Sequence, residues 1–202
     1  IIESGILPEG SLQLVSGGMG DMLSRLISQD VVSFTGSAST ALYLRSQPHL
    51  IENSIRFIAE QDSLNASILG PDAVPGSLEF ELFVKEVKRE MTTKAGQKCT
   101  AIRRIFVPEA HLYLMIDALK ASLAKTAIGD PRLQDTDMGA LVSNAQRRDV
   151  LEKASLIGQQ AERVFGDPDR FNVIGADAKK GAFLPPMLFH CNDPDNAKNV
   201  HD

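Results

Sequence analysis

The sequence has no tryptophan, few aromatic residues and no excess of positive charge, and each absence excludes a class of protein. Aromatic residues make up 5% of the 202 residues, too few for a surface on which nucleic-acid bases stack. The formal net charge of −5 lacks the basic excess of a general nucleic-acid binder. We find no apolar run long enough to cross a bilayer and no secretory leader. We therefore expect a cytoplasmic protein that binds neither nucleic acid nor membrane.

Cysteine and histidine are also scarce. The two cysteines, Cys99 and Cys191, are too few for a disulfide scaffold and suggest a reducing compartment, although the sequence leaves a single bridge between them open. The 4 histidines are scattered, and none lies near a cysteine at the spacing of metal ligands. We expect no metal site.

Short apolar runs alternate with helical patches along the chain, which is typical of an α/β fold with a largely parallel sheet. The chain opens on Ile1 without a methionine and stops at Asp202 just after an apolar segment, so we expect a piece of a longer protein. Strands are expected at residues 12–15, 31–34, 55–59, 66–69, 102–107 and 182–189, and helices at 21–28, 38–44, 78–92, 112–123 and 144–158. Pro185 and Pro186 interrupt the last strand, which suggests a sheet edge or the end of pairing.

Cys99 is the strongest candidate for chemistry, because it lies in a short polar loop between an expected helix and an expected strand. Lys94 and Lys98 precede it, and Arg103 and Arg104 follow it. A nearby positive field favours the thiolate, which is the nucleophilic form of cysteine. The alternative is a small buried hydrophobic residue, which many cysteines are.

Two further candidates lie at the ends of expected strands. Thr35, Gly36 and Ser37 form a strand-to-helix turn, where free backbone N–H groups and a helix dipole suit a phosphate. Glu60 ends another apolar run, at the edge of the sheet where ligand sites of α/β proteins form, and could act as a base. The alternatives are an ordinary helix cap and a solvated charge at the end of a strand.

Six short segments occur in a definite order: residues 7–15, Phe-Thr-Gly-Ser at 34–37, Glu-Gln-Asp-Ser-Leu-Asn at 60–65, Gly-Gln-Lys-Cys at 96–99, Ile-Gly-Asp-Pro at 128–131 and Met-Gly-Ala-Leu-Val-Ser at 138–143. Their types and order resemble the aldehyde dehydrogenase superfamily, and the resemblance covers nearly the whole chain. It implies an aldehyde dehydrogenase-like α/β fold. Residues 1–59 would be the C-terminal part of a Rossmann-type dinucleotide-binding domain, and residues 60–202 a catalytic domain that is incomplete at its C-terminal end.

The resemblance also implies a reaction, the NAD(P)-dependent oxidation of an aldehyde to a carboxylic acid. Cys99 would be the nucleophile that forms a thiohemiacetal and then a thioester, and Glu60 the base that activates water. Thr35, Gly36 and Ser37 would contact the cofactor, NADP or NAD, with NADP favoured by the resemblance. Other residues of the family's cofactor cleft would lie outside this chain, so we expect it to be inactive alone. The full-length protein is expected to be a homo-oligomer.

Two details narrow the resemblance. The base segment does not have the commoner Glu-Leu-Gly-Gly-Lys, and the spacing from Glu60 to Cys99 is longer than in most members. Both features are similar to the dehydrogenase domains of bifunctional phenylacetate-degradation enzymes, which also carry an oxepin-CoA hydrolase domain. The semialdehyde dehydrogenases of benzoyl-CoA breakdown are the nearest alternative. The substrate implied is a small aldehyde linked to CoA.

Two other functions stay open on the residues alone. A cysteine hydrolase or acyltransferase would also use Cys99, but no histidine lies near it in the sequence to act as its base. A non-catalytic α/β structural module would need Cys99 only as a core residue.

Overall fold

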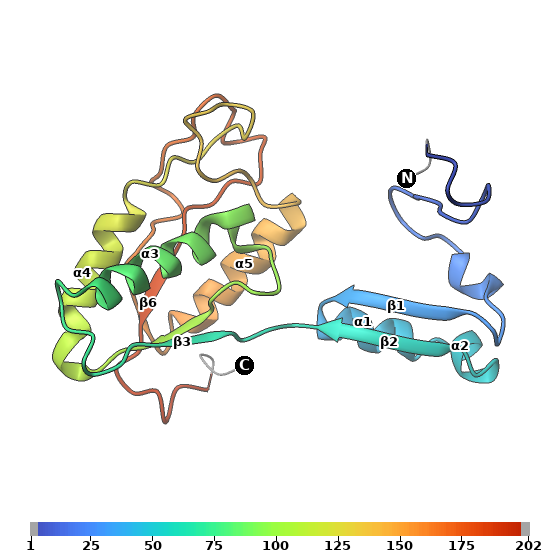
Figure 1. Ribbon diagram of the computed structural model, residues 1–202, viewed down its shortest axis with the longest axis horizontal. Helices are drawn as coiled ribbons and strands as arrows, with labels where there is room; N and C mark the ends of the chain where they lie inside the picture. The colour runs from blue at the N-terminus through green and yellow to red at the C-terminus, as the bar shows by residue number, and fades with distance from the viewer. Residues whose placement is uncertain (1–3, 199–202) are drawn as a thin grey trace. The chain divides into compact units, whose positions relative to one another are not determined.

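The computed structural model describes residues 4–198, and the chain divides into two compact units, Ile1–Asp62 and Ser63–Asp202 (Figure 1). The boundary lies three residues beyond the one expected from the sequence. As a result, Glu60 falls in the first unit and Cys99 in the second.

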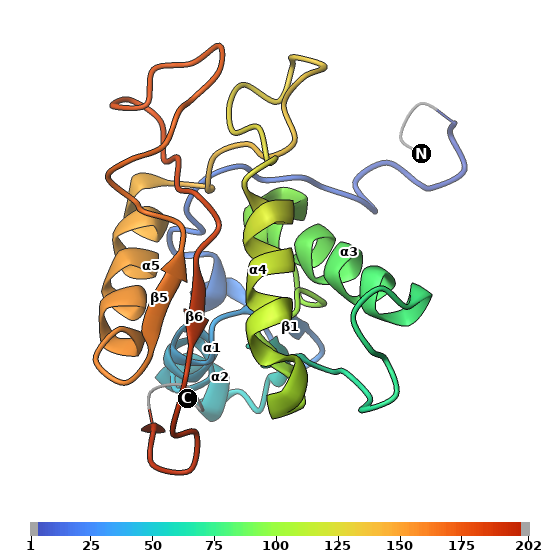
Figure 2. The ribbon, with the colours of Figure 1, turned by 90° about the vertical axis from the view of Figure 1, so that its left-hand side faces the viewer.

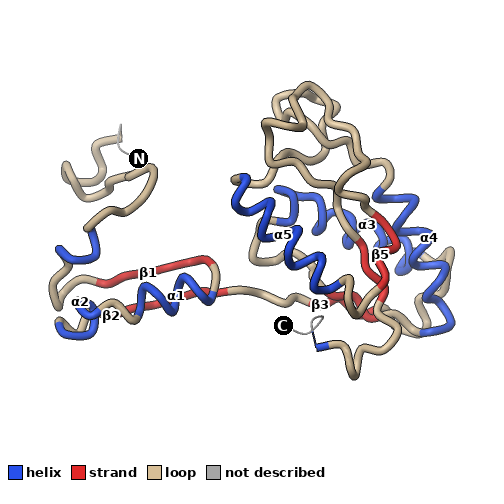
Figure 3. The backbone as a smooth tube through the Cα atoms, turned by 180° about the vertical axis from the view of Figure 1, so that it is seen from behind, coloured by secondary structure: helices blue, strands red, loops and turns tan. Residues whose placement is uncertain are grey.

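The first unit is built on two parallel strands, β1 (Val31–Gly36) and β2 (Arg56–Gln61). Helix α1 (Ala38–Arg45) lies in the connection between them and covers one face of the pair (Figures 1 and 3). A short helix, α2 (Pro48–Glu52), and a 3-10 turn, η1 (Met22–Arg25), complete the unit. Its buried apolar residues are Ala41, Leu44, Leu50 and Ile55.

Two expectations for the first unit are wrong. Residues 12–15 form no strand, and only a 3-10 turn occupies the helix expected at 21–28. Leu14 is 92% exposed. A strand needs a neighbour that accepts its backbone hydrogen bonds, and an apolar run by itself does not provide one.

In its described residues, 63–198, the second unit contains three long helices and two strand pairs. In one pair β3 (Ala66–Ile68) and β4 (Arg104–Phe106) are parallel, and in the other β5 (Glu162–Phe165) and β6 (Leu188–His190) are antiparallel. Figure 2 shows β5 and β6 between helices α5 and α4. The helical elements are α3 (Leu78–Thr92), η2 (Thr93–Gly96), η3 (Glu109–His111), α4 (Leu112–Leu123) and α5 (Asn144–Ile157).

Helix α3 begins and ends where the sequence predicts. The Ser77 hydroxyl accepts a hydrogen bond from the Phe80 N–H, and Glu79 and Glu81 lie in the first turn, where negative charge complements the helix dipole. Arg89 lies in the last turn, where a positive charge has the same effect. Because both ends of α3 are stabilised by local interactions, the helix fixes the start of the loop that follows it.

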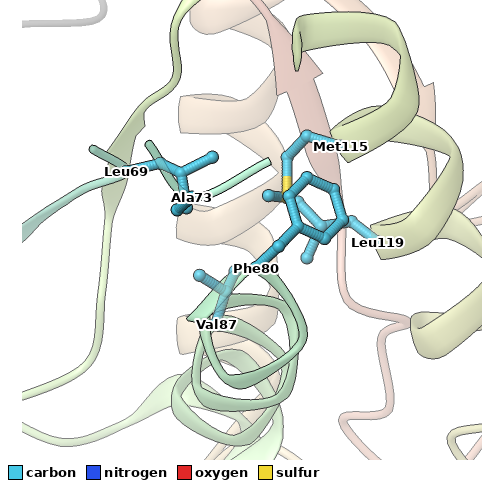
Figure 4. Packing of buried hydrophobic residues seen from close by; sticks show 6 residues of the cluster. All are labelled: Leu69, Ala73, Phe80, Val87, Met115 and Leu119. Carbon is cyan, nitrogen blue, oxygen red and sulfur yellow. The ribbon is translucent and has the colours of Figure 1, made fainter. Parts of the chain in front are cut away.

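The core of the second unit joins α3 and α4 to the end of β3. Figure 4 shows the side chains from the two helices packed against those that follow the strand. Partly buried residues of β4 and β6 extend the same cluster. Its buried members are Leu69, Ala73, Phe80, Val87, Met115 and Leu119.

In the strand expected at 182–189, the interruption at Pro185 and Pro186 is confirmed, but the residues before it form no strand. Pairing begins only at Leu188, and the partner strand β5 was not expected from the sequence. Residues 182–186 are buried without being a strand, because Pro185 and Pro186 have no N–H to donate to a neighbour. Within residues 4–198, no helix has both the length and the apolar character needed to span a membrane.

The packing of the core predicts that two leucines of α4 contribute differently to the stability of the fold. Leu119 is 0% exposed and Leu114 is 55% exposed. We expect Leu119→Ala to lower the free energy of unfolding by about 2–5 kcal/mol, because it leaves a cavity among packed side chains. Leu114→Ala, on the same helix, should change it by less than about 0.5 kcal/mol. Urea unfolding followed by circular dichroism measures both values, and equal losses would contradict the packing described.

Candidate active site

The loop that carries Cys99 starts with a sharp reversal at the end of α3. Lys94, Ala95 and Gly96 all have positive φ values, 52°, 54° and 72°. Lys94 and Ala95 are left-handed without being glycine, a conformation that costs about 1–3 kcal/mol per residue and is concentrated at functional sites. The chain thus reverses direction just after α3, only a few residues before the candidate nucleophile Cys99.

Gln97 links this loop to a segment far along the chain. Its Oε1 accepts a hydrogen bond from the Val142 N–H at 2.9 Å, and its Nε2 donates to the Lys94 carbonyl at 2.9 Å. Val142 belongs to the motif at 138–143 that the sequence singled out, and the last residue of that motif, Ser143, caps helix α5. The loop is therefore connected through one side chain to a second motif.

Lys98 is paired with a buried carboxylate. Its Nζ lies 2.8 Å from Oε1 of Glu90, whose side chain is 9% exposed, and Arg89 lies 3.2 Å from the same oxygen. The sequence predicts a positive field around Cys99, but the structure offsets the charge of Lys98 with a carboxylate on α3. The pair also fixes the residue directly before Cys99 to the helix.

The backbone carbonyl of Cys99 accepts two side-chain hydrogen bonds. Ser63 Oγ donates to it at 2.7 Å and Asn65 Nδ2 at 2.6 Å. Asn65 Nδ2 also lies 3.2 Å from the carbonyl of Ala101. The thiol of Cys99 is free and exposed, so the loop is held by its backbone and flanking side chains and not by burial of the cysteine. Cys191 is also a free thiol, which answers the open question of a bridge.

In the first unit, the turn expected to contact a phosphate lies between β1 and α1. Ser37 caps α1: its Oγ accepts from the Thr40 N–H at 3.2 Å, and the same oxygen lies 2.8 Å from the Thr40 hydroxyl and 3.2 Å from the Ser39 hydroxyl. Thr35 and Gly36 precede the cap and are exposed. Ser37 therefore acts as an ordinary helix cap, which was the alternative interpretation of this turn. The hydroxyls of Ser37, Ser39 and Thr40 form an exposed group around the cap.

Asp62 also occupies the N-terminus of α1. Its Oδ2 accepts the Ala38 N–H at 3.1 Å, and its own N–H donates to the Gly36 carbonyl at 3.2 Å. A Cβ on Gly36 would lie 2.5 Å from the ring of Phe34, so that ring covers the space a side chain would fill. The hydroxyl and N–H donors suit phosphate oxygens of a dinucleotide, although Asp62 takes one of the donors and Phe34 covers one side of the turn.

Glu60 lies on β2 and pairs with Thr35 on β1 in the register of the two strands. The structure therefore brings the proposed base and the turn of residues 35–37 together at the same end of the strand pair. Glu60 is exposed, so the first unit does not desolvate its carboxylate. Cys99 belongs to the other unit.

Sequence reasoning missed four polar residues near the candidate site: Asp62, Ser63, Asn65 and Glu90. A signal for Asp62 and Ser63 is their place directly after β2, where the commoner motif has two glycines, and Asn65 follows two residues later. Glu90 could have been found from its position three residues after Val87, because that spacing places its carboxylate on the buried face of α3. In the part of the chain that the structure describes, no three metal-ligating side chains gather.

The motif at 128–131 lies beside the motif at 138–143. The Gly129 N–H donates to the Met138 carbonyl at 3.0 Å, and both Ile128 and Met138 are buried. Asp130 accepts hydrogen bonds from Nε and from the backbone N–H of Arg132, at 3.0 Å each. These bonds lower the pKa of Asp130 to about 2, the side-chain bond from Arg132 being the largest cause.

In comparisons with known proteins, this chain is similar to aldehyde dehydrogenases. A model of the aldehyde dehydrogenase family matches residues 1–199. A 3,4-dehydroadipyl-CoA semialdehyde dehydrogenase of Aromatoleum evansii is 47% identical over 100% of this chain. A 3-sulfolactaldehyde dehydrogenase of Priestia megaterium is 26% identical over 96% of it. The chain spans 39% and 38% of the lengths of these two relatives.

Solved structures are similar in fold. A betaine aldehyde dehydrogenase of Staphylococcus aureus in complex with NAD+ aligns with a TM-score of 0.71 and 27% identity. The alignment covers 85% of this chain and 32% of that one. The α/β fold expected from the sequence, of the aldehyde dehydrogenase type, is confirmed.

The Asp130–Arg132 pair predicts a pH dependence. Because the pKa of Asp130 is about 2 in the folded protein and 3.8 ordinarily, its ionised form stabilises the fold above about pH 4. This contribution should be lost as the pH falls from about 4 towards 2. Arg132→Gln should raise the pKa of Asp130 towards its ordinary value, as measured by an NMR titration of the carboxyl carbon.

The control for this titration is Arg170→Gln, which removes the partner of Asp167 from another exposed pair. It should leave the pKa of Asp130 unchanged. An Asp130 titration that is the same in Arg132→Gln and in the unsubstituted protein would show that Arg132 is not the cause.

Proposed function

Because the chain belongs to the aldehyde dehydrogenase family, we propose that the full-length protein containing it oxidises an aldehyde to a carboxylic acid through Cys99. The observation that carries the proposal is the free, exposed thiol of Cys99 in a loop that is held by bonds to the Cys99 carbonyl and by the side chains of Gln97 and Lys98. An exposed thiol in a held loop is accessible to a substrate and still has a defined position.

The proposed reaction begins when the thiolate of Cys99 attacks the aldehyde carbon and forms a thiohemiacetal. The backbone N–H of Cys99 is one donor available to the oxygen that becomes negative. A bound nicotinamide dinucleotide supplies the acceptor for the hydride that leaves this carbon. The product on Cys99 is a thioester, and the aldehyde has then lost two electrons.

Hydrolysis of the thioester is the proposed task of Glu60. Its carboxylate takes a proton from water as the water oxygen attacks the thioester carbon, and the thiolate of Cys99 leaves. A positioned base for water favours release of the acid over transfer of the acyl group to CoA, because a thiol acceptor would need no activated water. Support for this role comes from the place of Glu60 at the carboxyl end of β2, where ligands of α/β sheets bind.

The cofactor would be held in part by the turn at Thr35, Gly36 and Ser37. Hydroxyls and N–H groups at the start of α1 suit its phosphate oxygens. On this proposal the first unit belongs to the dinucleotide-binding domain and the second unit to the catalytic domain. The cofactor is NAD or NADP, with NADP favoured by the family resemblance. The NAD+ complex of a similar enzyme supports this class of cofactor.

The substrate proposed is an aldehyde linked to CoA. A relative with 47% identity over the whole chain is named for a CoA-linked semialdehyde, which supports this class. The base segment favours a semialdehyde of phenylacetate degradation, with one from benzoyl-CoA breakdown as the second candidate. We also infer a homo-oligomer for the full-length protein, as in the family it resembles.

Substitution of the two proposed catalytic residues should separate the two half-reactions in the full-length protein. Cys99→Ala should abolish aldehyde oxidation. Glu60→Gln should leave a burst of about one reduced nicotinamide per site, followed by turnover about 10²–10⁴-fold slower, because the thioester forms but water is not activated. Stopped-flow absorbance of the reduced nicotinamide measures both phases.

Cys191→Ser is the matched control for the cysteine substitution and should retain full turnover. A thiol-reactive aldehyde probe that labels Cys99 no faster than Cys191 would argue for a non-catalytic module. Normal steady-state turnover in Glu60→Gln would remove Glu60 from the mechanism.

The substrate class predicts a preference that kinetics can measure. A CoA-linked semialdehyde should have a kcat/KM at least about tenfold above that of the same semialdehyde as a free acid, because binding of the remote CoA group stabilises the transition state as well. Equal values would contradict a CoA-linked substrate while leaving aldehyde oxidation intact. The kcat/KM values of the two CoA-linked semialdehydes, measured in the same assay, show which of the two pathways supplies the better substrate.

A further inference from the structure

The segment between β2 and β3 contributes two side chains to the backbone of Cys99, and we propose that Ser63 and Asn65 are positioning residues for the nucleophile. This inference rests on the proposed function of Cys99. Neither side chain is assigned a contact with substrate or cofactor. Both act through the carbonyl of Cys99, at 2.7 Å from Ser63 Oγ and 2.6 Å from Asn65 Nδ2.

Both bonds end on the same carbonyl oxygen. A carbonyl oxygen has two lone pairs and can accept two bonds, and together these two short bonds restrain the peptide that follows Cys99. The peptide plane sets one of the two soft backbone dihedrals of the residue. The direction in which Sγ leaves the backbone therefore depends on these bonds.

Asn65 holds more than the cysteine. Its side chain also donates to the Ala101 carbonyl at 3.2 Å, and its backbone carbonyl accepts the N–H groups of Arg103 at 2.9 Å and Arg104 at 3.2 Å. One residue at the start of β3 thus binds the chain from Cys99 to the start of β4. The other side of the loop is held by the ion pair of Lys98.

Burial does not hold the nucleophile itself. Cys99 and Thr100 are exposed, and exposed loops move more than the elements they connect. A nucleophile displaced by about 1 Å can lose about 10²-fold in rate. Without the two bonds, the remaining contacts hold the loop only before and after Cys99.

The position of these residues in the sequence links them to the proposed base. Ser63 and Asn65 follow Glu60 in the motif Glu-Gln-Asp-Ser-Leu-Asn, where the commoner motif is Glu-Leu-Gly-Gly-Lys. Counted from Glu60, Ser63 stands where that motif has its second glycine, and Asn65 lies one residue beyond the motif. Glycine has no side chain with which to bind a carbonyl, so the departure from the common motif coincides with the bond from Ser63 to Cys99.

The test measures loop motion and catalysis separately in the full-length protein, in Ser63→Ala, Asn65→Ala and Ser63→Thr. Ser67→Ala, on β3, is the matched control. Amide hydrogen exchange in residues 97–101 should be faster in both alanine variants. Their kcat for aldehyde oxidation should fall about 10- to 100-fold with KM within about twofold, because the nucleophile is misplaced and substrate binding is not altered. Ser63→Thr keeps a hydroxyl and should restore both values.

Exchange rates and kcat values of the alanine variants equal to those of Ser67→Ala would overturn the proposal. Faster exchange without a loss of kcat would also overturn it, because the bonds would then be structural only. Retention of aldehyde oxidation by Cys99→Ala would instead refute the proposed function, and the exchange measurement would still report on the bonds.

Discussion

The candidate active site depends on how an exposed cysteine is kept in place. Cys99 is not buried, and so the contacts around it must supply the order that a core residue gets from packing. Hydrogen bonds to its carbonyl, the Gln97 link to residue 142 and the Lys98–Glu90 pair supply it from three directions. Each of these contacts leads to an element anchored in the core or to a capped helix.

The Lys98–Glu90 pair changes the electrostatic argument about the nucleophile. A lysine next to a cysteine in the sequence suggests a thiolate stabilised by positive charge. In the structure that ammonium is 2.8 Å from a carboxylate which is itself 9% exposed, and the second carboxylate oxygen of Glu90 is buried without a hydrogen-bond partner. Arg89 lies 3.2 Å from Oε1, the oxygen that Lys98 contacts, so Glu90 binds two cations, and its pair with Lys98 fixes the loop to α3.

The helices of the second unit could be predicted closely from the sequence, whereas several strands and the contacts of the site could not. Helix α3 carries its own signals, a serine cap and an apolar stripe, and its bounds are as expected. The run at 12–15 has apolar residues but no partner, and the strand at 162–165 has a partner that lies far along the chain. Strand pairing and the bonds from Asn65 to Cys99 join residues distant in sequence, and no local pattern encodes them.

The polar run after Glu60 joins the two proposed catalytic groups through a short stretch of chain. Glu60 ends the strand β2, Asp62 binds the first N–H of α1, and Asn65 binds the carbonyl of Cys99. Asp62 has a φ of 35°, in the left-handed region that residues other than glycine rarely adopt. A substitution at Asp62 would therefore disturb the start of α1, whereas a substitution at Asn65 would disturb the nucleophile loop.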